Sequence, residues 1–191
     1  MTFYFTDEMS RFDHLNAHEN VIVHVSIDPD LQVLKFDVDL DSLPPIRLDG
    51  YEVIVDFTLE NFNNNNTFWT DSNELEMQER ILNYRPTWDL VNTNYKDSLE
   101  NVTANYYPIN SAISMREVGG DRQFTVMNDR SQSGSALTEG GIQFMQNRRI
   151  PSDDSRGMGE WLNEEDAYGN GIRVPATYYV DIFRNSQCTS K

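Results

Sequence analysis

The sequence predicts an all-β protein built as an antiparallel β-sandwich. About ten short runs of alternating apolar and polar side chains follow one another, separated by Gly, Pro, Asn or Asp residues. No apolar pattern has the length and period of a long helix. Hydrophobic residues make up 38% and aromatic residues 12% of the 191 residues, which is enough to fill a core. Because there is no internal repeat or linker, residues 1–191 are expected to form a single β-sandwich domain or a fragment of one.

Acidic side chains dominate the charge of the chain. Asp and Glu number 31 against 15 Lys and Arg, which gives a net charge of −16. Nucleic acids and anionic membranes bind basic patches, so neither is expected as a partner. No apolar run approaches the ~18 residues of a membrane span, and residues 1–13 lack the basic start of a signal peptide. Cys188 is the single cysteine, so no disulfide is expected within the chain.

Strands in the first third are predicted from apolar alternation. Residues 31–40 place Val, Leu and Phe between Lys and Asp, as a half-buried strand does. Residues 51–59 alternate in the same way after the turn signal Asp49-Gly50. We expect these two strands to pair as an antiparallel hairpin. Two further strands are expected at residues 2–6 and 21–27.

Two structures compete for the stretch at residues 67–88. Its centre, Glu74–Leu82, is rich in helix formers, and an Asp or Ser before it could cap a helix. The same run alternates apolar with polar side chains, which favours a strand with one face buried. Asp71–Asn73 would then form the turn of a hairpin. The predicted buried face of this strand consists of Leu75, Met77 and Ile81.

Loops and strands also alternate in the second half. Residues 129–141 are rich in Ser and Gly and predict a long loop, and residues 151–170 predict irregular structure. Pro175 cannot donate a ladder hydrogen bond, so the last strand is expected to lie at a sheet edge or to contain a bulge. The strands predicted here cover residues 89–95, 106–116, 123–127, 142–149 and 172–183.

Two residue patterns are compatible with metal binding, and both favour a simpler interpretation. His14 and His18 have a spacing that places two ligands on one helical face, but no convincing third ligand accompanies them. Asp37, Asp39 and Asp41 offer hard oxygens for calcium without the Gly and Glu of a known calcium loop. We therefore expect solvated side chains at both places and no metal site in this chain.

A cluster of opposite charges stands out between residues 148 and 156. Arg148 and Arg149 are followed by Asp153, Asp154 and Arg156. Bidentate ion pairs could fix an irregular loop, or the same groups could bind a ligand. Sequence alone leaves both interpretations open.

Two features suggest contact with carbohydrate: aromatic side chains that could bind a sugar, and acceptor sequences for attached N-glycans. Tyr106, Tyr107 and Trp161 have faces on which sugars can stack, although the favoured interpretation is that they are ordinary core aromatics. Asn65 and Asn101 begin Asn-x-Thr sequences, which are acceptor sites for N-glycans in secreted proteins.

Six short motifs occur in a recognisable order. They are TDSN, MQER, NYRPTW, NYYPINS, NDRSQSGS and NRRIPSDDSRGMGEWLNE, and together they cover Thr67 to about Glu164. In this order they resemble the late part of the lysosomal-type, class II α-mannosidases, which form family thirty-eight of the glycoside hydrolases. Residues 50–191 are similar to that region, and residues 1–49 match it less clearly.

The resemblance implies a zinc-dependent retaining α-mannosidase acting on mannose-containing glycans. In that family a preceding β/α domain carries the zinc ligands, among them a His-x-Asp pair, and the nucleophilic aspartate. This chain contains no His-x-Asp pair, so it resembles the non-catalytic C-terminal portion, part of a galactose-mutarotase-like supersandwich. Its partner would be the missing catalytic domain, and zinc would be bound there. The residues carried over to the edge of the sugar site are Tyr106, Tyr107, Arg148, Arg149, Asp153, Asp154 and Arg156.

Membership of this family would place the protein in the lysosome or vacuole, or outside the cell. The alternative is a free-standing carbohydrate-binding or structural β-sandwich module, because fold does not determine function.

Overall fold

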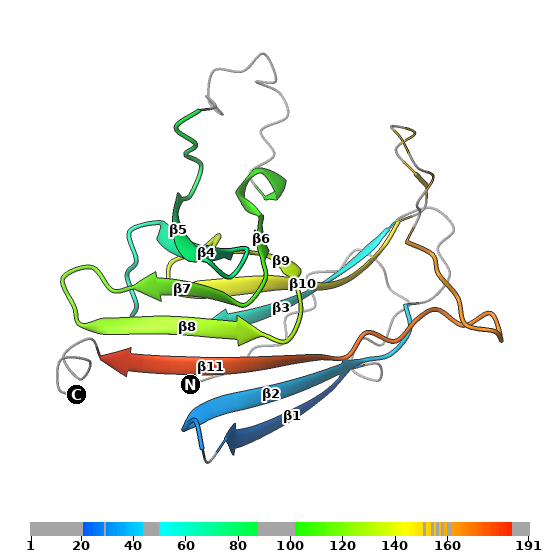
Figure 1. The fold of residues 1–191 in the computed structure, drawn as a ribbon, viewed down its shortest axis with the longest axis horizontal. Coiled ribbons are helices and arrows are strands. Elements are labelled where there is room, and N and C mark those ends of the chain that lie inside the picture. Colours follow the sequence, from blue (N-terminus) through cyan, green and yellow to red (C-terminus); the bar gives the residue numbers. More distant parts are fainter. Residues whose placement is uncertain are drawn as a thin grey trace.

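Two antiparallel sheets form the protein in the computed structural model, which describes residues 21–28, 30–43, 50–87, 102–150, 152–153, 155, 157, 159 and 162–184. The larger sheet has seven strands in the order β1-β2-β11-β8-β7-β4-β5, and the smaller has the order β3-β10-β9-β6. Figure 1 shows the smaller sheet lying behind the larger one. The strands are β1 (Val21–Asp28), β2 (Val33–Leu40), β3 (Tyr51–Thr58), β4 (Thr67–Ser72), β5 (Glu76–Ile81), β6 (Tyr107–Ile109), β7 (Ala112–Arg116), β8 (Arg122–Asn128), β9 (Gln132–Ser135), β10 (Gly141–Arg149) and β11 (Ala176–Arg184).

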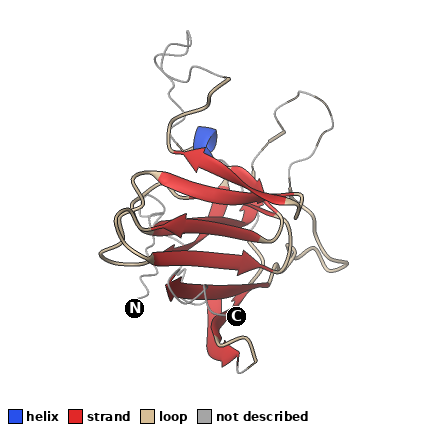
Figure 2. Cartoon of the chain, turned by 60° about the vertical axis from the view of Figure 1, so that its left-hand side comes forward, coloured by secondary structure: helices blue, strands red, loops and turns tan. Residues whose placement is uncertain are grey.

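Helix is almost absent from the described residues. A single 3₁₀ turn at Thr103–Asn105 is the helical element drawn in Figure 2. No helix in the described part of the chain is long and apolar enough to span a membrane. The predicted all-β antiparallel sandwich is therefore confirmed.

Aromatic rings from both sheets form the centre of the core. Phe57 of β3 packs edge-on against Phe36 of β2 and Tyr178 of β11, with ring centroids 5.3 and 5.4 Å apart. Phe144 of β10 lies 5.1 Å from the same tyrosine ring. Such tilted and edge-to-face pairs add to the stabilisation that comes from burial. The core therefore joins the middle of the large sheet to the small sheet.

The expected hairpin between residues 31–40 and 51–59 is wrong. β2 pairs with β1 on one side and β11 on the other, whereas β3 pairs with β10 in the other sheet. Residues 41–50 therefore connect the two sheets. Alternation shows which face of a strand is buried, but a hairpin and a sheet-to-sheet connection produce the same alternation.

The stretch at residues 67–88 forms a hairpin, which confirms the strand over the helix. The turn lies later than predicted, at residues 73–75, because Asn73 and Glu74 both adopt φ of 58°. Asp71 is not in the turn. It belongs to β4, is 3% exposed, and accepts a hydrogen bond from the Glu74 N–H at 2.8 Å. A buried carboxylate thus closes the turn from inside.

The predicted buried face of β5 is wrong. Leu75 lies in the turn and is 86% exposed, and Met77 and Ile81 also face solvent. The half-buried side of β5 carries Arg80 instead, whose Nε donates to Thr70 Oγ1 at 3.0 Å. β5 is an edge strand of its sheet, where packing of a long arginine stem can replace an apolar side chain.

Residues 106–116 form two strands rather than one. β6 belongs to the small sheet and β7 to the large sheet, with a corner at Asn110 and Ser111. The corner is held by hydrogen bonds from Ser111 N and Oγ to Asp71 Oδ2, at 2.8 and 2.7 Å. The chain thus crosses between sheets without breaking the apolar alternation that predicted a single strand.

The predicted long loop at residues 129–141 contains β9. Gly134 lies in this strand, and a Cβ there would meet Ile109 Cδ1 at 2.4 Å and the Gln143 carbonyl oxygen at 2.8 Å. The glycine is therefore required by close packing between strands, although in the sequence it resembles a loop residue.

The last strand also differs from the prediction. β11 begins at Ala176, directly after Pro175, and lies between β2 and β8 instead of at an edge. The proline precedes the first paired residue, so its missing N–H costs the sheet no hydrogen bond. A long central strand results.

The asparagine-rich segment at residues 62–66 is only partly solvated. Phe62 and Asn64 are buried. The Asn64 Oδ1 accepts a hydrogen bond from Gly140 N at 3.1 Å, while the Asn64 N–H donates to Glu139 Oε2 at 2.7 Å. Gly140 has φ of 73°, and a Cβ there would lie 2.4 Å from the Leu59 carbonyl oxygen. Asn64 therefore links two loops in the interior.

Several expectations fall on residues outside the described part of the chain. They are the strands at residues 2–6 and 89–95, the histidines His14 and His18, Trp161 and Cys188.

Candidate functional site

The two predicted site tyrosines point to opposite faces of the small sheet. Tyr107 is buried between the sheets, 5.8 Å from the ring of Phe68. The guanidinium groups of Arg80 and Arg85 lie 4.3 and 4.7 Å from its ring centroid, as in cation–π contacts. This tyrosine occupies the position of a core residue and offers no open face to a sugar.

Tyr106 instead joins a polar row on the outer face of the small sheet. Its hydroxyl donates to Gln143 Oε1 at 3.2 Å, and Gln143 Nε2 donates to Asp56 Oδ2 at 2.7 Å. Four residues away on β3, in the same pair of strands, Glu52 Oε1 contacts Arg148 Nε at 3.1 Å. The structure therefore brings Tyr106 and Arg148 to one face and separates both from Tyr107.

Burial raises the pKa of the Tyr106 hydroxyl from 10.0 to about 12, and the negative charges of Glu52 and Asp56 add to the effect. The folded protein thus keeps this phenol neutral at a pH where the unfolded chain ionises it. The associated stability is fully present below pH 10.0 and is lost as the pH rises toward about 12. We expect the Tyr106→Phe variant to lose less stability than the parent between these pH values, measured by urea unfolding. An identical pH dependence of the two proteins would contradict this.

Arg149 is a buried arginine at the end of β10. The residue is 6% exposed, and Nη1 donates to the Leu43 carbonyl oxygen at 2.8 Å. Nη2 donates to Glu165 Oε1 at 3.1 Å. Arg149 therefore links the segment after β2 to the loop before β11, and its positive charge has a carboxylate partner.

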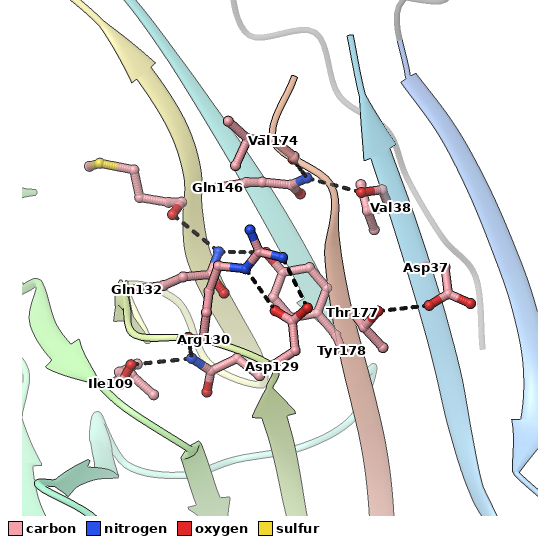
Figure 3. Close-up of polar contacts among 12 residues, drawn as sticks. Asp37, Val38, Ile109, Asp129, Arg130, Gln132, Gln146, Val174, Thr177 and Tyr178 are labelled. Carbon is pink, nitrogen blue, oxygen red and sulfur yellow. Dashed lines mark hydrogen bonds and ion pairs between the residues drawn. The ribbon is translucent and has the colours of Figure 1, made fainter. Parts of the chain in front are cut away.

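A β-bulge in β10 places a second polar side chain beside Arg149. The register with β3 shifts between Met145 and Asn147, so Gln146 is the extra residue. Its side chain is 6% exposed and turns inward. Figure 3 shows its Nε2 donating to the carbonyl oxygens of Val38, at 3.1 Å, and Val174, at 2.8 Å. The bulge thus fixes an amide between both sheets.

A pocket of about 300 Å³ opens beside the bulge. Gln146 and Arg149 contribute polar groups to its lining, and Arg148 also borders it. Aliphatic side chains form other parts of the lining, namely Leu43, Leu162, Ile172 and Val174. A few hydrogen-bonding groups among apolar walls are typical of a site that binds a small molecule.

The remaining predicted site residues lie nearby in sequence and are only partly described. Asp153 accepts a hydrogen bond from the Ser155 N–H at 2.9 Å, which closes a local turn. Asp154, Arg156 and Asn101 lie outside the described residues. Asn65 is exposed in a turn with φ of 48°, where a glycan would meet no core side chain.

The acidic residues at the end of β2 interact with basic side chains. Asp37 accepts hydrogen bonds from Lys35 Nζ at 2.9 Å and Thr177 Oγ1 at 2.8 Å, which together hold its pKa below the usual value. Asp39 contacts Arg173 Nη2 at 2.5 Å, and Asp41 lies 4.0 Å from Arg173 Nε. Across the described residues, no group of three or more His, Cys, Asp or Glu side chains is arranged to hold a metal ion.

Comparison with known families decides where this sandwich belongs. Residues 10–156 match the family described as the glycosyl hydrolases family 38 C-terminal domain, and that span is well over half of the 191 residues. The chain belongs to this family. The resemblance carried by its short motifs is thereby confirmed.

Curated relatives of this family 38 domain include lysosomal α-mannosidases. The protein from Bos taurus is 47% identical over 113 residues, which is 59% of this chain and 10% of the relative. That from Homo sapiens is 37% identical over 156 residues, 82% of this chain and 14% of the relative. The Dictyostelium discoideum protein is 37% identical over 98 residues, 51% of this chain and 9% of the relative. The chain thus spans 9–14% of the length of these relatives.

Sequence reasoning missed most of the pocket in this family 38 domain. Arg149 was singled out, but Gln146, Leu43 and Ile172 carried no signal as site residues. A glutamine within an alternating strand resembles any half-exposed position, and only the bulge turns its amide inward. A bulge inserts one residue without a sequence signature of its own when glycine is not used.

Proposed function

We propose that this chain is the C-terminal β-sandwich portion of an α-mannosidase that removes terminal α-mannose from glycans. The observation that carries the proposal is the family 38 C-terminal match over residues 10–156. The small share of each relative that the chain covers, 9–14%, supports a role as one portion of a larger enzyme. In this proposal the chain alone does not hydrolyse glycosides.

In this proposal a separate catalytic domain hydrolyses the glycosidic bond. That domain uses a retaining mechanism and binds the zinc ion. The described residues of this chain do not form a fitting donor set for zinc, so we assign no reaction step to a metal here. The proposed role of the sandwich is to pack against the catalytic domain and to contribute Arg148 and its neighbours at the edge of the sugar site.

We further propose that the protein is located in a lysosome or vacuole and is glycosylated. Lysosomal relatives from animals and from Dictyostelium discoideum support the compartment. The exposed turn position of Asn65 supports glycosylation there, and Asn101 is proposed as a second acceptor.

A segment exchange tests the proposed function directly. In the human relative, the segment that aligns with this chain is replaced by the corresponding residues of the chain. We expect the secreted chimera to hydrolyse an aryl α-mannoside, because the sandwich should support the catalytic domain of a family member. The isolated 191-residue chain should show no turnover with or without added zinc.

Two variants of the chimera control for folding. Asp71→Ala should abolish activity through loss of the folded sandwich, whereas Glu79→Ala, an exposed change on the same hairpin, should leave activity intact. A well-folded but inactive chimera, or zinc-dependent turnover by the isolated chain, would rule out the proposal.

A further inference from the structure

β1 is an edge strand that lacks the features by which sheet edges are normally protected from further pairing. Its eight residues, Val21–Asp28, pair with β2 in an unbroken register, so the strand contains no bulge. Residues 21–27 read VIVHVSI and include no Pro, Lys, Arg, Asp or Glu. Among the described residues, no strand pairs with β1 on its other side (Figure 1). One row of backbone N–H and C=O groups therefore faces away from β2 and is open to a further strand.

The other three edges of the two sheets each carry a protecting feature. β5 has Glu79 and Arg80 among its six residues, and β3 has exposed Glu52 and Asp56. β6 is only three residues long, with Pro108 at its centre. Charged side chains, short length and proline all hinder the addition of a strand. β1 is thus the exception among the sheet edges in the described part of the chain.

The core between the sheets is also open along β1. Val25 lies opposite Phe36 in the ladder, so the two side chains share the core-facing side of the sheet. Ile27, opposite Leu34, lies on the same side. Phe36 is 2% exposed, whereas Val25 is 52% and Ile27 70% exposed, and Leu31 in the following turn is 64% exposed. Such a group of core-facing apolar side chains in contact with water indicates a surface that another segment covers.

We propose that β1 accepts one further β-strand, which a part of the same enzyme outside this chain supplies. The strand pairs with the open row of backbone groups of β1, as in β-strand addition to a sheet edge. Its apolar side chains cover Val25 and Ile27. The inference rests on the proposed function, since that function places this chain within a larger polypeptide.

The size of the relatives and the charge of the chain favour this occupant over a second copy. The matched region is 10% of the Bos taurus relative and 14% of the Homo sapiens relative, so most of each polypeptide lies outside it. A second copy would bring another net charge of −16, and the two copies would repel each other. Val21 and Val23 already pack against the core, so a strand added to β1 extends the interior of the same sandwich.

The edge defines the kind of segment that fits. Side chains on the core-facing side of the added strand should be apolar at alternate positions, because they lie beside Val25 and Ile27. On the opposite face of β1, His24 and Ser26 are exposed, so polar partners suit that side. Asp28 at the end of β1 disfavours an acidic neighbour. The expected segment is therefore a run of about six to eight residues with apolar–polar alternation and few acids.

Hydrogen exchange in β1 tests the inference. Mass spectrometry follows deuterium uptake by Val21–Asp28 in the recombinant 191-residue chain and in the native protein, purified from its source with an antibody against the chain. In the recombinant chain, the amides that point away from β2 should exchange rapidly. In the native protein they should exchange at least about tenfold more slowly, because the added strand accepts their hydrogen bonds. β8, which is paired on both sides, should exchange slowly in both proteins.

The same measurement separates the inference from the proposed function. A native protein of 22.1 kDa would contradict both, because it would contain no further polypeptide to supply the strand. A larger native protein in which β1 exchanges rapidly would leave the α-mannosidase proposal intact and overturn the inference alone.

A charged substitution on the edge gives a second test in the chimera, with the exchanged segment beginning at residue 10 so that β1 is included. Val25→Lys places an ammonium group where the added strand covers the sheet, and we expect the secreted amount of chimera to fall at least about tenfold. In the isolated chain the same change should leave the midpoint of urea unfolding unchanged, because Val25 is 52% exposed there. Val118→Lys, at an exposed position between β7 and β8, is the matched control and should have no effect in either protein.

Two further results would overturn the inference. The first is slow exchange of all β1 amides in the recombinant chain, which would mean that the edge is covered without the rest of the enzyme. The second is an equal effect of Val25→Lys in the chimera and in the isolated chain, which would mean that no additional segment packs on β1.

Discussion

Replacing Asp71 with alanine is expected to lower the free energy of unfolding by about 3–5 kcal/mol. The buried carboxylate accepts three hydrogen bonds, from Glu74 N, Ser111 N and Ser111 Oγ, at 2.7 to 2.8 Å. Alanine would leave two backbone N–H groups and one hydroxyl without their acceptor. The loss would affect both the β4–β5 turn and the corner between β6 and β7. Urea unfolding followed by tryptophan fluorescence measures the effect.

Two further substitutions separate the hydrogen bonds from general effects on the hairpin. Asp71→Asn keeps one acceptor oxygen, so its destabilisation should be intermediate. Glu79→Ala removes an exposed carboxylate from the neighbouring strand β5 and should change stability by no more than about 0.5 kcal/mol. If Asp71→Ala costs no more than Glu79→Ala, the carboxylate does not hold the corner.

The Tyr178→Ala variant is expected to lose roughly 4 kcal/mol of stability, within the range measured for large aromatic side chains cut back to alanine. Tyr178 is fully buried in β11, between the rings of Phe57 and Phe144. Its hydroxyl accepts a hydrogen bond from Gln132 Nε2 at 2.8 Å (Figure 3). Removal of the ring leaves a cavity where the two sheets meet.

Tyr178→Phe distinguishes the ring from the hydroxyl. This variant keeps the packing and should lose only about 1 kcal/mol, because one hydrogen bond is removed. Burial raises the pKa of the Tyr178 hydroxyl to about 12, so the phenylalanine variant should also lose less stability than the parent above pH 10. A Tyr178→Phe loss as large as that of Tyr178→Ala would mean that the hydrogen bond, and not the packing, dominates.

The strands could be predicted from sequence because burial of one face leaves a period of two. Residues 142–149 and 123–127 appear in the structure as β10 and β8 with nearly the same limits. The sheet to which a strand belongs could not be predicted in the same way. β2 and β3 have similar patterns, yet long-range packing of Phe36 and Phe57 places them in opposite sheets.

Buried polar residues account for most of what the sequence did not reveal. Asn64, Asp71 and Gln146 resemble surface residues by type, but each is buried because backbone groups of distant segments supply its hydrogen bonds. Those partners lie 40 to 108 residues away along the chain. A local sequence pattern contains no information about these partners. The burial of the three side chains, including that of Gln146 in the pocket lining, can therefore be recognised only in the structure.

The family assignment, by contrast, could be made from short motifs in order. Arg148 and Arg149 belong to one of those motifs, and the structure gives them different surroundings. Arg148 pairs with Glu52 on the outside of the small sheet, while Arg149 is buried against Leu43 and Glu165. Adjacent residues in a strand face opposite sides, so a motif can contain both a surface residue and a structural one.

The mass of the native protein in its source tests the central claim most directly. An antibody raised against this chain would detect it on a denaturing gel, before and after enzymatic removal of N-glycans. The account predicts a band far above 22.1 kDa that shifts on deglycosylation, as expected for a glycosylated α-mannosidase with this sandwich as one portion. A band at 22.1 kDa that does not shift would contradict the account and favour a separate binding or structural protein.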